Sequence, residues 1–386
     1  MMKEKSVASH TSCYGCGVCS LVCAKGAISF TYNEDGFLHP VVAEDKCVDC
    51  GLCLKVCAWA SEEHPAQNDY TIQCYAAYSN DEAHRQACSS GGIGYELARY
   101  AIKNVYAFCG VRYNTASGHA EHYLAENLEQ LNASRGSKYI QSHSYNAFSH
   151  LEKGKKYMVV GTPCQIDSLR RYLRLKKLEE DFLLVDFFCH GVPSDLMWQK
   201  YVAECGLKEA TDVSWRDKRT GWHDSWNIIF KSQSGETSSL MSKGDLFYKF
   251  FLRNRCLGKA CYDDCKYKMA SSAADIRIGD LWGTKYQSDE KGVSGVITFT
   301  EKGEQVLHEL DTCTIIPEPL EVVAESQMKK CASRPSSYEY VREALKTDAT
   351  LSEIDSRASR IELFRDEIPH KIKYYSRRII EKLLCK

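Results

Sequence analysis

Eight of the twenty cysteines in this chain lie within its first 57 residues, where they form two copies of one motif. In each copy, two residues separate each of the first three cysteines from the next, three residues precede the fourth, and the copies are 34 residues apart. Three thiols at this spacing reach three corners of an iron–sulfur cube, and adjacent glycines allow the sharp turns of the loop. The spacing therefore predicts two 4Fe-4S clusters. The eight thiols are Cys13, Cys16, Cys19, Cys23, Cys47, Cys50, Cys53 and Cys57.

Over its whole length this region resembles a bacterial two-cluster ferredoxin. In such proteins the fourth cysteine of each run ligates the opposite cluster, so we assign the thiols in crossed sets. Alanine stands where a proline usually follows the fourth cysteine, at Ala24 and Ala58, which removes no ligand. A pair of zinc sites is the alternative, although zinc prefers two separated Cys-x2-Cys pairs. One set is Cys13, Cys16, Cys19 and Cys57, and the other is Cys47, Cys50, Cys53 and Cys23.

Three segments of small residues beyond this region could present backbone N–H groups to an anion. They are residues 88–94, 134–139 and 161–165. The first and third precede expected helices, whose N-termini favour phosphate. Taken alone, each segment is also explained by ordinary helix capping. The chain has no GxGxxG after a strand and no GxxxxGK[ST], so the residues give no support to a classical dinucleotide-binding or P-loop site.

Six short motifs follow one another along the rest of the chain: Ser90-Gly-Gly92, Arg135-Gly-Ser-Lys-Tyr139, Gly161-Thr-Pro-Cys-Gln165, Cys189-His-Gly-Val-Pro-Ser194, Arg216-Asp-Lys-Arg-Thr-Gly-Trp222 and Ala274-Asp-Ile-Arg-Ile-Gly-Asp-Leu-Trp-Gly283. In this order they resemble the coenzyme F-420 hydrogenase/dehydrogenase beta-subunit family, over roughly residues 70 to 330. Members of that family bind FAD and pass electrons between iron–sulfur clusters and a two-electron partner. The resemblance therefore implies an FAD site, because a flavin exchanges both one and two electrons. Its residues are expected to be Ser89, Ser90, Gly91, Gly92, Arg135, Ser137, Lys138, Thr162 and Cys164.

A second group of cysteines lies within the region of this resemblance. It supplies four thiols, and the resemblance favours a third 4Fe-4S cluster close to the flavin. A structural zinc and unligated buried cysteines are the alternatives. Cys256 is also open to interpretation as a core thiol, and the cluster then needs another ligand, while Cys164 could ligate iron, lie against the flavin ring or simply be buried. The predicted ligands are Cys189, Cys256, Cys261 and Cys265.

Three polar residues of these motifs are the predicted catalytic residues. His190 could donate a proton to a reduced substrate, or it could hydrogen-bond a turn. Asp217 belongs to a charged and aromatic run that could hold an anionic substrate or a flavin phosphate, or form a surface turn. Asp280 lies between two glycines, Gly279 and Gly283, in a segment that could be a tight loop with a functional carboxylate or a purely structural loop.

Hydrophobic periodicity predicts the elements that position these residues. Residues 27–32 and 37–42 are expected to pair as strands around a turn at 33–36. From Tyr70 onward strand-like and helical patterns alternate, which predicts an α/β region. The further expected strands are 72–78, 105–111, 156–160, 183–188, 226–231 and 293–300. The expected helices are 93–103, 145–152, 165–173, 194–203, 245–252 and 301–310.

The expected fold class is α+β, with an N-terminal two-cluster ferredoxin-like domain, a mixed α/β flavin-binding region and a basic C-terminal helix. Residues 371–386 carry six Lys or Arg against one Glu, with apolar residues at helical spacing. Such a helix can lie on anionic lipid, although packing on its own domain or on a partner is the simpler interpretation. The expected domains are 1–65 for the ferredoxin domain, 70–180 for the FAD-binding part, 181–335 for the part with the third cluster, and 336–386 for the helical tail.

Composition indicates the setting in which this chemistry takes place. The 50 Lys and Arg residues against 51 Asp and Glu leave a net charge of −1, so nucleic acid is not an expected partner. No apolar run approaches the roughly 18 residues that a membrane span needs. Many cysteines and no apolar leader at the N-terminus favour a reducing, cytoplasmic location, with metal or redox chemistry in place of disulfides.

The leading hypothesis is an iron–sulfur flavoenzyme. Electrons from a redox partner such as ferredoxin enter the N-terminal clusters, pass to FAD, and leave to an organic small-molecule substrate or a deazaflavin-like coenzyme. An electron-transfer subunit that docks on a separate catalytic protein is the alternative, and a regulatory module that senses oxidants is a third hypothesis.

Overall fold

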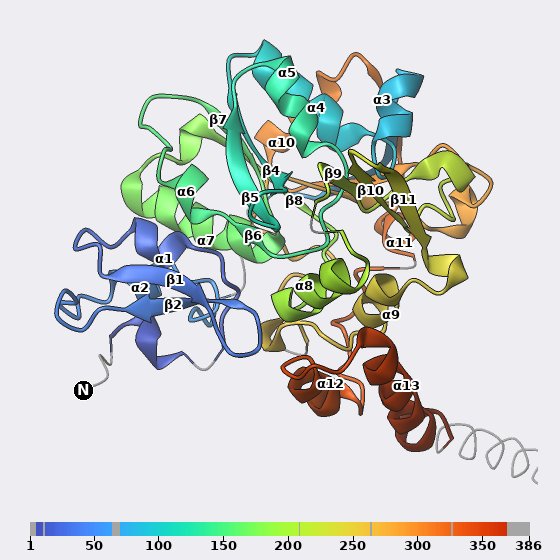
Figure 1. Ribbon diagram of the computed structural model, residues 1–386. Coiled ribbons are helices and arrows are strands. Elements are labelled where there is room, and N and C mark those ends of the chain that lie inside the picture. The colour runs from blue at the N-terminus through green and yellow to red at the C-terminus, as the bar shows by residue number, and fades with distance from the viewer. Residues whose placement is uncertain are drawn as a thin grey trace, which may run out of the picture.

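The computed structural model describes residues 5–10, 12–63, 70–207, 209–262, 265–325 and 327–368. A small N-terminal unit lies beside a larger body, and the last two labelled helices, α12 and α13, lie together at one end of that body (Figure 1). The N-terminal unit is organised by a hairpin of two antiparallel strands, β1 (Ile28–Tyr32) and β2 (Leu38–Val42). Asn33 closes the hairpin turn, because its side chain accepts hydrogen bonds from two backbone N–H groups of the turn.

A short helix follows each cysteine loop of the N-terminal unit. These helices are α1 (Val18–Leu21) and α2 (Leu52–Lys55). Each begins directly after a glycine in the left-handed conformation, Gly17 with φ of 77° and Gly51 with φ of 76°. Only a residue without a Cβ adopts that conformation readily. The repeat in the sequence is therefore also a repeat in the backbone.

The larger body contains a mixed sheet that has nine strands among the described residues. Its order is β14-β3-β13-β12-β8-β7-β4-β5-β6. Four adjacent strands, β12, β8, β7 and β4, run parallel, so their carboxyl ends meet at one edge. The strands are β3 (Gln73–Ser79), β4 (Ala107–Asn114), β5 (His119–Ala125), β6 (Ser142–His143), β7 (Tyr157–Val160), β8 (Phe182–Phe187), β12 (Ile276–Asp280), β13 (Ser294–Thr298) and β14 (Cys313–Pro317).

Both faces of this sheet are covered, because successive residues of a strand point to opposite sides. Met158 of β7 packs with α4 and α10 on one face, whereas its neighbour Val159 packs with α6 and α7 on the other. The N-terminal unit belongs to this second face through Val18 and Val56. The helices are α3 (Glu82–Ala87), α4 (Ile93–Lys103), α5 (Leu128–Leu131), α6 (Tyr145–Phe148), α7 (Pro163–Lys176), α10 (Glu301–His308) and α11 (Leu320–Val323).

A second hydrophobic cluster joins a small sheet to the remaining helices. Among the described residues this sheet has the order β11-β10-β9. The fully buried Arg255 ties helix α13 to the cluster by pairing with Asp355 and Glu362. The elements are β9 (Asp212–Ser214), β10 (Asn227–Ser232), β11 (Gly235–Leu240), α8 (Asp195–Glu204), α9 (Leu246–Leu252), α12 (Tyr338–Ala344) and α13 (Leu351–Glu362).

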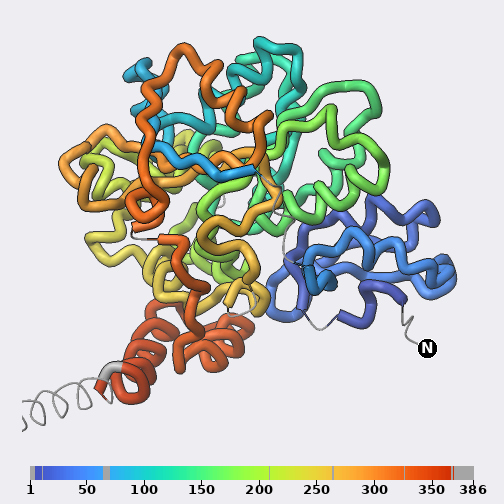
Figure 2. The backbone as a smooth tube through the Cα atoms, turned by 180° about the vertical axis from the view of Figure 1, so that it is seen from behind, coloured from blue at the N-terminus to red at the C-terminus, as the bar shows by residue number. Residues whose placement is uncertain are grey.

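Segments distant in sequence lie side by side at the edge of the main sheet. Seen from behind, the orange segment near residue 315 crosses the blue strand near residue 75 (Figure 2). These are β14 and β3, which pair antiparallel. The main sheet also extends over the domain boundary expected after residue 180, because β7 and β8, which lie on either side of that boundary in the sequence, are hydrogen-bonded neighbours.

The expected α+β class is confirmed. The predicted helix 93–103 is found at those residues as α4, and the strands predicted at 156–160 and 183–188 are β7 and β8 with ends moved by one residue. The sequence pattern does not predict β5, because its alternation includes two histidines and a glutamate. The predicted basic helix at 371–386 lies outside the described residues. Among the helices described, none is long and apolar enough to pass through a bilayer.

Candidate functional site

The structure brings Cys57 to the first cysteine run. Burial raises the pKa of Cys13 to about 12, and the charges of Cys16 and Cys57 act in the same direction. Burial and the charges of Cys16 and Cys13 likewise raise the pKa of Cys19. We call Cys13, Cys16, Cys19 and Cys57 the proximal group, and this is the crossed grouping predicted from the sequence.

The proximal group lies between the N-terminal unit and the larger body, with Cys16 and Cys19 buried and Cys13 and Cys57 half-buried. Ser144 donates a hydrogen bond of 2.7 Å to the backbone oxygen of Cys16. The backbone N–H of Ala58, beside Cys57, donates to Ser168 Oγ on α7 at 3.2 Å. Lys266 Nζ donates to the oxygen of Ala58 at 3.1 Å. The larger body therefore contacts both loops that supply proximal thiols.

The other four cysteines, Cys23, Cys47, Cys50 and Cys53, which we call the distal group, are more accessible. Cys50 is exposed, Cys23 and Cys47 are half-buried, and Cys53 is buried. Burial raises the pKa of Cys53, and the charge of Cys50 contributes to the shift. Val48, between two of these cysteines, has 62% of its surface exposed.

Several predicted site residues of the larger body lie where parallel strands of the main sheet end. Residues 161–165 follow β7, Cys189 follows β8, and Asp280 ends β12. These strands are parallel neighbours, so their carboxyl ends lie side by side. Ligands of α/β sheets bind at this edge, where loops leave the strands.

Four thiols converge near this edge, but Cys256 is not one of them. Burial raises the pKa of Cys189 to about 12, and the charges of Cys261 and Cys265 contribute. The charges of Cys189 and Cys261 contribute in the same way to the raised pKa of Cys164, whose largest cause is burial. We call Cys164, Cys189, Cys261 and Cys265 the inner group.

Backbone contacts explain why Cys261 enters the inner group and Cys256 does not. The segment after β8 runs beside residues 256–262, with Gly258 N–H donating to Val192 at 2.9 Å. A Cβ placed on Gly191 would lie 3.3 Å from the Cβ of Cys261, which brings that residue close to the loop after Cys189. The oxygen of Cys256 instead accepts from the N–H of Ser194 at 2.8 Å, and its side chain is buried in the core with α8 and α9. Cys164 takes the place predicted for Cys256.

The inner group adjoins the proximal group. The charge of Cys16 is among the influences on the pKa of Cys164, after burial and the nearer thiols. Tyr14, which follows the first proximal cysteine, has its pKa raised by burial and then by the charges of Cys164 and Cys265. Its ring lies 5.4 Å from that of Trp59 and 6.0 Å from that of Tyr267, both edge-on.

A buried arginine organises a second cluster at the same edge. Arg216 pairs with Asp280 at 2.9 Å and donates to the Tyr139 hydroxyl at 3.2 Å and the oxygen of Ser89 at 3.3 Å. Its guanidinium carbon lies 4.4 Å from the ring centre of Trp226 and 5.2 Å from that of Trp282. Burial lowers the pKa of Arg216, but Asp280 and Tyr139 raise it by more, so the side chain stays charged.

The small-residue segments 88–92 and 135–138 meet beside Arg216. Ser137 donates to Ser89 Oγ from its backbone at 2.9 Å and from its hydroxyl at 3.1 Å. A Cβ on Gly91 would lie 2.5 Å from the oxygen of Ala77, so only glycine fits there. Lys138 Nζ is held by three backbone oxygens of its own loop, and burial lowers its pKa.

Two polar atoms around this meeting point are buried without a hydrogen-bond partner among the described residues. They are Nε of Arg135 and one carboxylate oxygen of Asp280. In addition, no side chain caps the N-terminus of the 11-residue helix α4 at Gly92. Thr162 differs, because its backbone N–H and hydroxyl are both occupied by the Gln165 side chain at the start of α7. Ser90 is likewise occupied, by the oxygen of Val293.

The three predicted catalytic residues have different surroundings. Asp280 belongs to the Arg216 cluster. His190 lies with its ring 5.0 Å from that of Phe251, which is itself 5.4 Å from Tyr139. Asp217 points elsewhere, because its carboxylate pairs with Arg219 at 2.7 Å. The structure therefore does not bring Asp217 together with the other two.

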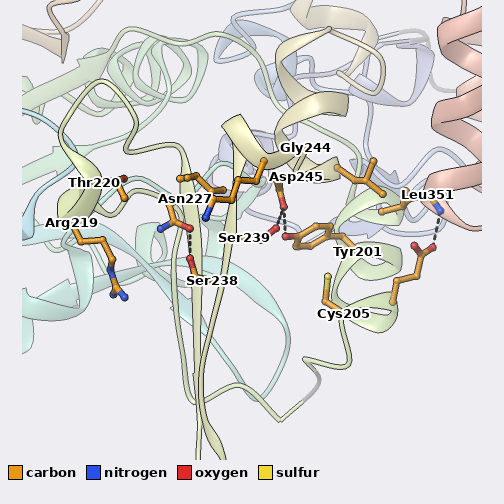
Figure 3. Close-up of a pocket in the computed structure, with 14 residues that line it drawn as sticks. Tyr201, Cys205, Arg219, Thr220, Asn227, Ser238, Ser239, Gly244, Asp245 and Leu351 are labelled. Atoms are coloured by element: carbon orange, nitrogen blue, oxygen red, sulfur yellow. Dashed lines mark hydrogen bonds between the residues drawn. The ribbon is translucent and has the colours of Figure 1, made fainter.

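A pocket of about 500 Å³ lies elsewhere, between α8 and the β10–β11 hairpin (Figure 3). In its wall Tyr201 and Ser239 both donate to Asp245. None of the residues predicted from the sequence as site residues lines it. The edge of the main sheet, rather than this pocket, is the candidate site.

The donor chemistry of the three thiol groups fits iron–sulfur clusters. Among the described residues, no three His, Cys, Asp or Glu side chains stand close enough to hold a single metal ion. Each group nevertheless supplies four thiols, the ligand set of a 4Fe-4S cluster. Together with the fold, this set defines a protein of the iron–sulfur electron-transfer class.

Comparison with known families agrees with this class. Residues 12–61 match the model of the 4Fe-4S dicluster domain, and residues 154–318 match that of the C-terminal part of the coenzyme F420 hydrogenase/dehydrogenase beta subunit. Residues 154–318 are therefore similar to the C-terminal part of the F420 hydrogenase/dehydrogenase beta subunit, and residues 12–61 are similar to a 4Fe-4S dicluster domain. The family resemblance seen in the sequence motifs is confirmed.

Among solved structures, the chain is similar to one from the F420-reducing [NiFe] hydrogenase complex of Methanosarcina barkeri. The two share 16% sequence identity over 80% of this chain and 97% of that chain, with a TM-score of 0.47. No curated protein matches the chain.

Sequence reasoning missed the aromatic residues that lie between the proximal group, the inner group and the Arg216 cluster. Tyr14 and Phe251 are ordinary core residues by type, and no spacing signals them. Tyr139 alone had a signal, because it ends the 135–139 motif.

Proposed function

We propose that the protein is an iron–sulfur flavoprotein oxidoreductase that passes electrons through its 4Fe-4S clusters and FAD to an organic two-electron substrate or a deazaflavin-like coenzyme. One observation carries the proposal: the inner thiol group adjoins the proximal group on one side and, through aromatic residues, the Arg216 cluster on the other. This arrangement supports electron transfer from a one-electron carrier to a two-electron site.

The inner group supports a third 4Fe-4S cluster, with Cys164 as the fourth ligand in place of Cys256. Cys164 sits at the N-terminal end of α7, whose Ser168 accepts a hydrogen bond from the proximal loop at 3.2 Å. One helix therefore contacts the proximal loop and supplies an inner thiol. Lys268 donates to the oxygen of Cys189 at 2.9 Å and places a positive charge beside the thiolates.

The meeting point of segments 88–92 and 135–138 fits FAD. The unpaired Nε of Arg135, which is a positively charged donor, and the uncapped N-terminus of α4 suit phosphate. A bound flavin exchanges single electrons with clusters and two electrons with an organic substrate. Ser89 and Ser137 hold the two loops together, and Arg216 holds Asp280 so that one carboxylate oxygen is free to accept a hydrogen bond.

Within this proposal the predicted catalytic residues divide into two roles. Asp280 binds and orients the flavin or the substrate, and His190 holds a proton for the substrate at the boundary between the inner group and Phe251. Asp217 has no role at the site, because its carboxylate is engaged by Arg219.

The same proposal includes the domain boundaries, the cellular location and the point of electron entry. The ferredoxin domain occupies residues 1–65, and residues 70–335 form the beta-subunit-like part. The many thiols fit a cytoplasmic, reducing setting. The exposed distal group suits electron entry from a partner such as ferredoxin.

The alternative function is an electron-transfer subunit that docks on a separate catalytic protein. The same exposed distal group supports it, because an accessible cluster can exchange electrons with any docked protein. The alternative requires no flavin, and this distinguishes it from the leading proposal.

Anaerobic purification tests the proposal. We expect about twelve iron atoms per chain, from three clusters, and one FAD. Eight iron atoms with FAD would remove the third cluster, and clusters without flavin would leave the electron-transfer alternative.

A matched pair of variants tests the ligand set. Cys164→Ser should lower the iron content by about four atoms, whereas Cys256→Ser should leave it unchanged, although both thiols are buried in the same body. Loss of iron in the Cys256 variant alone would restore the ligand set predicted from the sequence.

A further inference from the structure

Tyr14 belongs to the ferredoxin unit by sequence but to the inner group by its contacts. It lies between Cys13 and Gly15 in the proximal loop. Its backbone oxygen accepts a hydrogen bond from Gln141 of the larger body at 3.4 Å. Its ring packs against Tyr267, which follows the inner-group segment. The docked ferredoxin unit therefore inserts one aromatic side chain beside the inner thiols.

The hydroxyl of Tyr14 is buried and has no hydrogen-bond partner among the described residues. Leaving a buried hydroxyl unpaired is unfavourable, so a partner is expected. The neighbouring Tyr267 shows the usual solution, because its hydroxyl donates to Asp167 at 2.8 Å. Two tyrosines thus share one wall, and only the hydroxyl of Tyr267 has a partner among the described residues.

Tyr14 lies on the side of the inner group, because its ring contacts that of Tyr267, which is two residues from Cys265. Cys164, Cys265 and Cys261 are, in that order, the strongest charges that act on the Tyr14 hydroxyl, ahead of Asp167. All three belong to the inner group. A 4Fe-4S cluster on that group would bring further sulfur atoms to the same side.

We infer that Tyr14 donates a hydrogen bond to a sulfur of the inner cluster and thereby tunes its reduction potential. This inference rests on the third cluster of the proposed function. Hydrogen bonds to sulfur help to set cluster potentials. Reduction adds negative charge, which a donor stabilises, so Tyr14 raises the potential of the inner cluster. Because Tyr14 belongs to the ferredoxin unit, the inner cluster reaches this potential only while that unit is docked.

The test compares Tyr14→Phe with Tyr267→Phe in the full-length, anaerobically purified protein. Both substitutions remove one buried hydroxyl from the same wall, but only the first removes a donor to sulfur. Redox titration followed by electron paramagnetic resonance resolves the clusters. In Tyr14→Phe we expect the equilibrium constant for reduction of one cluster to fall about tenfold. For a one-electron couple this lowers the reduction potential of that cluster by about 59 mV. The other clusters should keep their potentials, and Tyr267→Phe should shift none.

The outcomes separate this inference from the proposed function. Twelve iron atoms with unchanged potentials in Tyr14→Phe would overturn the inference and leave the third cluster in place. Eight iron atoms in the wild-type protein would overturn the third cluster and with it this inference, while FAD in that protein would leave the flavoprotein proposal in place. An equal shift in Tyr267→Phe would assign the effect to packing and overturn the donor role.

A second measurement covers the case in which Tyr14→Phe does not fold. Wild-type protein grown with tyrosine that carries ¹⁷O in its phenol group should show a hyperfine coupling between oxygen and the reduced inner cluster. Absence of that coupling would overturn the inference without any substitution.

Discussion

The proximal and distal cysteine groups come from one repeated motif but differ in their surroundings. The proximal group has two buried and two half-buried thiols and lies against α6 and α7, where Ser144 and Ser168 hydrogen-bond its loops. The distal group includes the exposed Cys50 and lies beside Val48, which is 62% exposed. Exposure and hydrogen bonds to sulfur both influence cluster potentials, so identical ligand sets are expected to give unequal clusters. The repeated motif thus specifies the ligands of both clusters, whereas packing against the larger body decides how accessible each cluster is to solvent and partners.

Removal of one ligand from each group should produce the largest contrast. Cys16→Ala and Cys50→Ala should each lose about four iron atoms. Cys16→Ala should in addition lower the melting temperature of the larger body, because the proximal loop packs in the same hydrophobic core as α6 and α7. Iron analysis and calorimetry measure both effects. Equal losses of stability would show that the interface does not depend on the proximal cluster.

The repeated glycines provide a matched pair for backbone and packing effects. Gly51→Ala should cost about 1–2 kcal/mol, the penalty for a left-handed alanine. Gly17→Ala incurs the same penalty, and its new Cβ would also lie 2.8 Å from Ser144 Oγ, whereas that of Gly51 meets nothing closer than 3.9 Å. We expect a further loss of about 1–3 kcal/mol at Gly17.

Denaturant unfolding measures the difference between the glycine variants. Adding Ser144→Ala to Gly17→Ala should recover part of the extra loss. Equal free energies of unfolding for Gly17→Ala and Gly51→Ala would contradict the expected difference in packing between the proximal and distal loops.

Iron removal should also distinguish the groups. Under mild oxidation with a chelator, we expect iron to leave in two phases that differ in rate by about tenfold, because oxidation of thiolates follows exposure. The fast phase should be absent from Cys50→Ala, which lacks the distal cluster. A single phase in the wild-type protein would argue for equal access to both clusters.

A single hydrogen bond of the interface should have a smaller effect. Ser144→Ala leaves the backbone oxygen of Cys16 without its 2.7 Å donor and should cost about 1–2 kcal/mol. Ser149→Ala, which removes an exposed hydroxyl of the same helical segment, is the control and should be near neutral. A neutral Ser144→Ala would mean that water replaces the lost donor.

The weakest expected effect is a dependence of docking on pH. His143 accepts or donates a 2.8 Å hydrogen bond with Tyr32 of β1, and burial and then His119 lower its pKa below the usual value. The unfolded chain therefore binds the proton first, so stability rises with pH near the usual value of about 6.5 and is lost as the pH falls below it.

The substitution His143→Gln should flatten this dependence. The exposed His150 supplies the control, because His150→Gln should leave the slope unchanged. Stability measured by denaturant titration between roughly pH 5.5 and 7.5 gives the slope. An unchanged slope in His143→Gln would assign the dependence to other groups.

Local pattern is sufficient to predict the ferredoxin thiols and many elements of the larger body. The helix at 93–103 follows from its apolar periodicity and its preceding glycines. The inner group can be predicted only in part. Closeness in sequence to Cys261 favours Cys256 as a ligand, but its backbone bonds to Ser194 and its side chain enters the core. Sequence distance does not indicate which way a side chain points after a turn.

The sequence by itself determined the two four-cysteine runs and the family motifs, because a cluster-binding loop is a local structure that spacing encodes. The crossed ligand sets are what the resemblance to two-cluster ferredoxins implies. Tertiary structure decided which group is buried, which thiol completes the inner group, and that Tyr14 lies beside it. Those outcomes depend on strands β7, β8 and β12 aligning their carboxyl ends and on α7 packing against the N-terminal unit. Such contacts join residues more than a hundred positions apart, for example Ala58 to Ser168, and no local spacing specifies them.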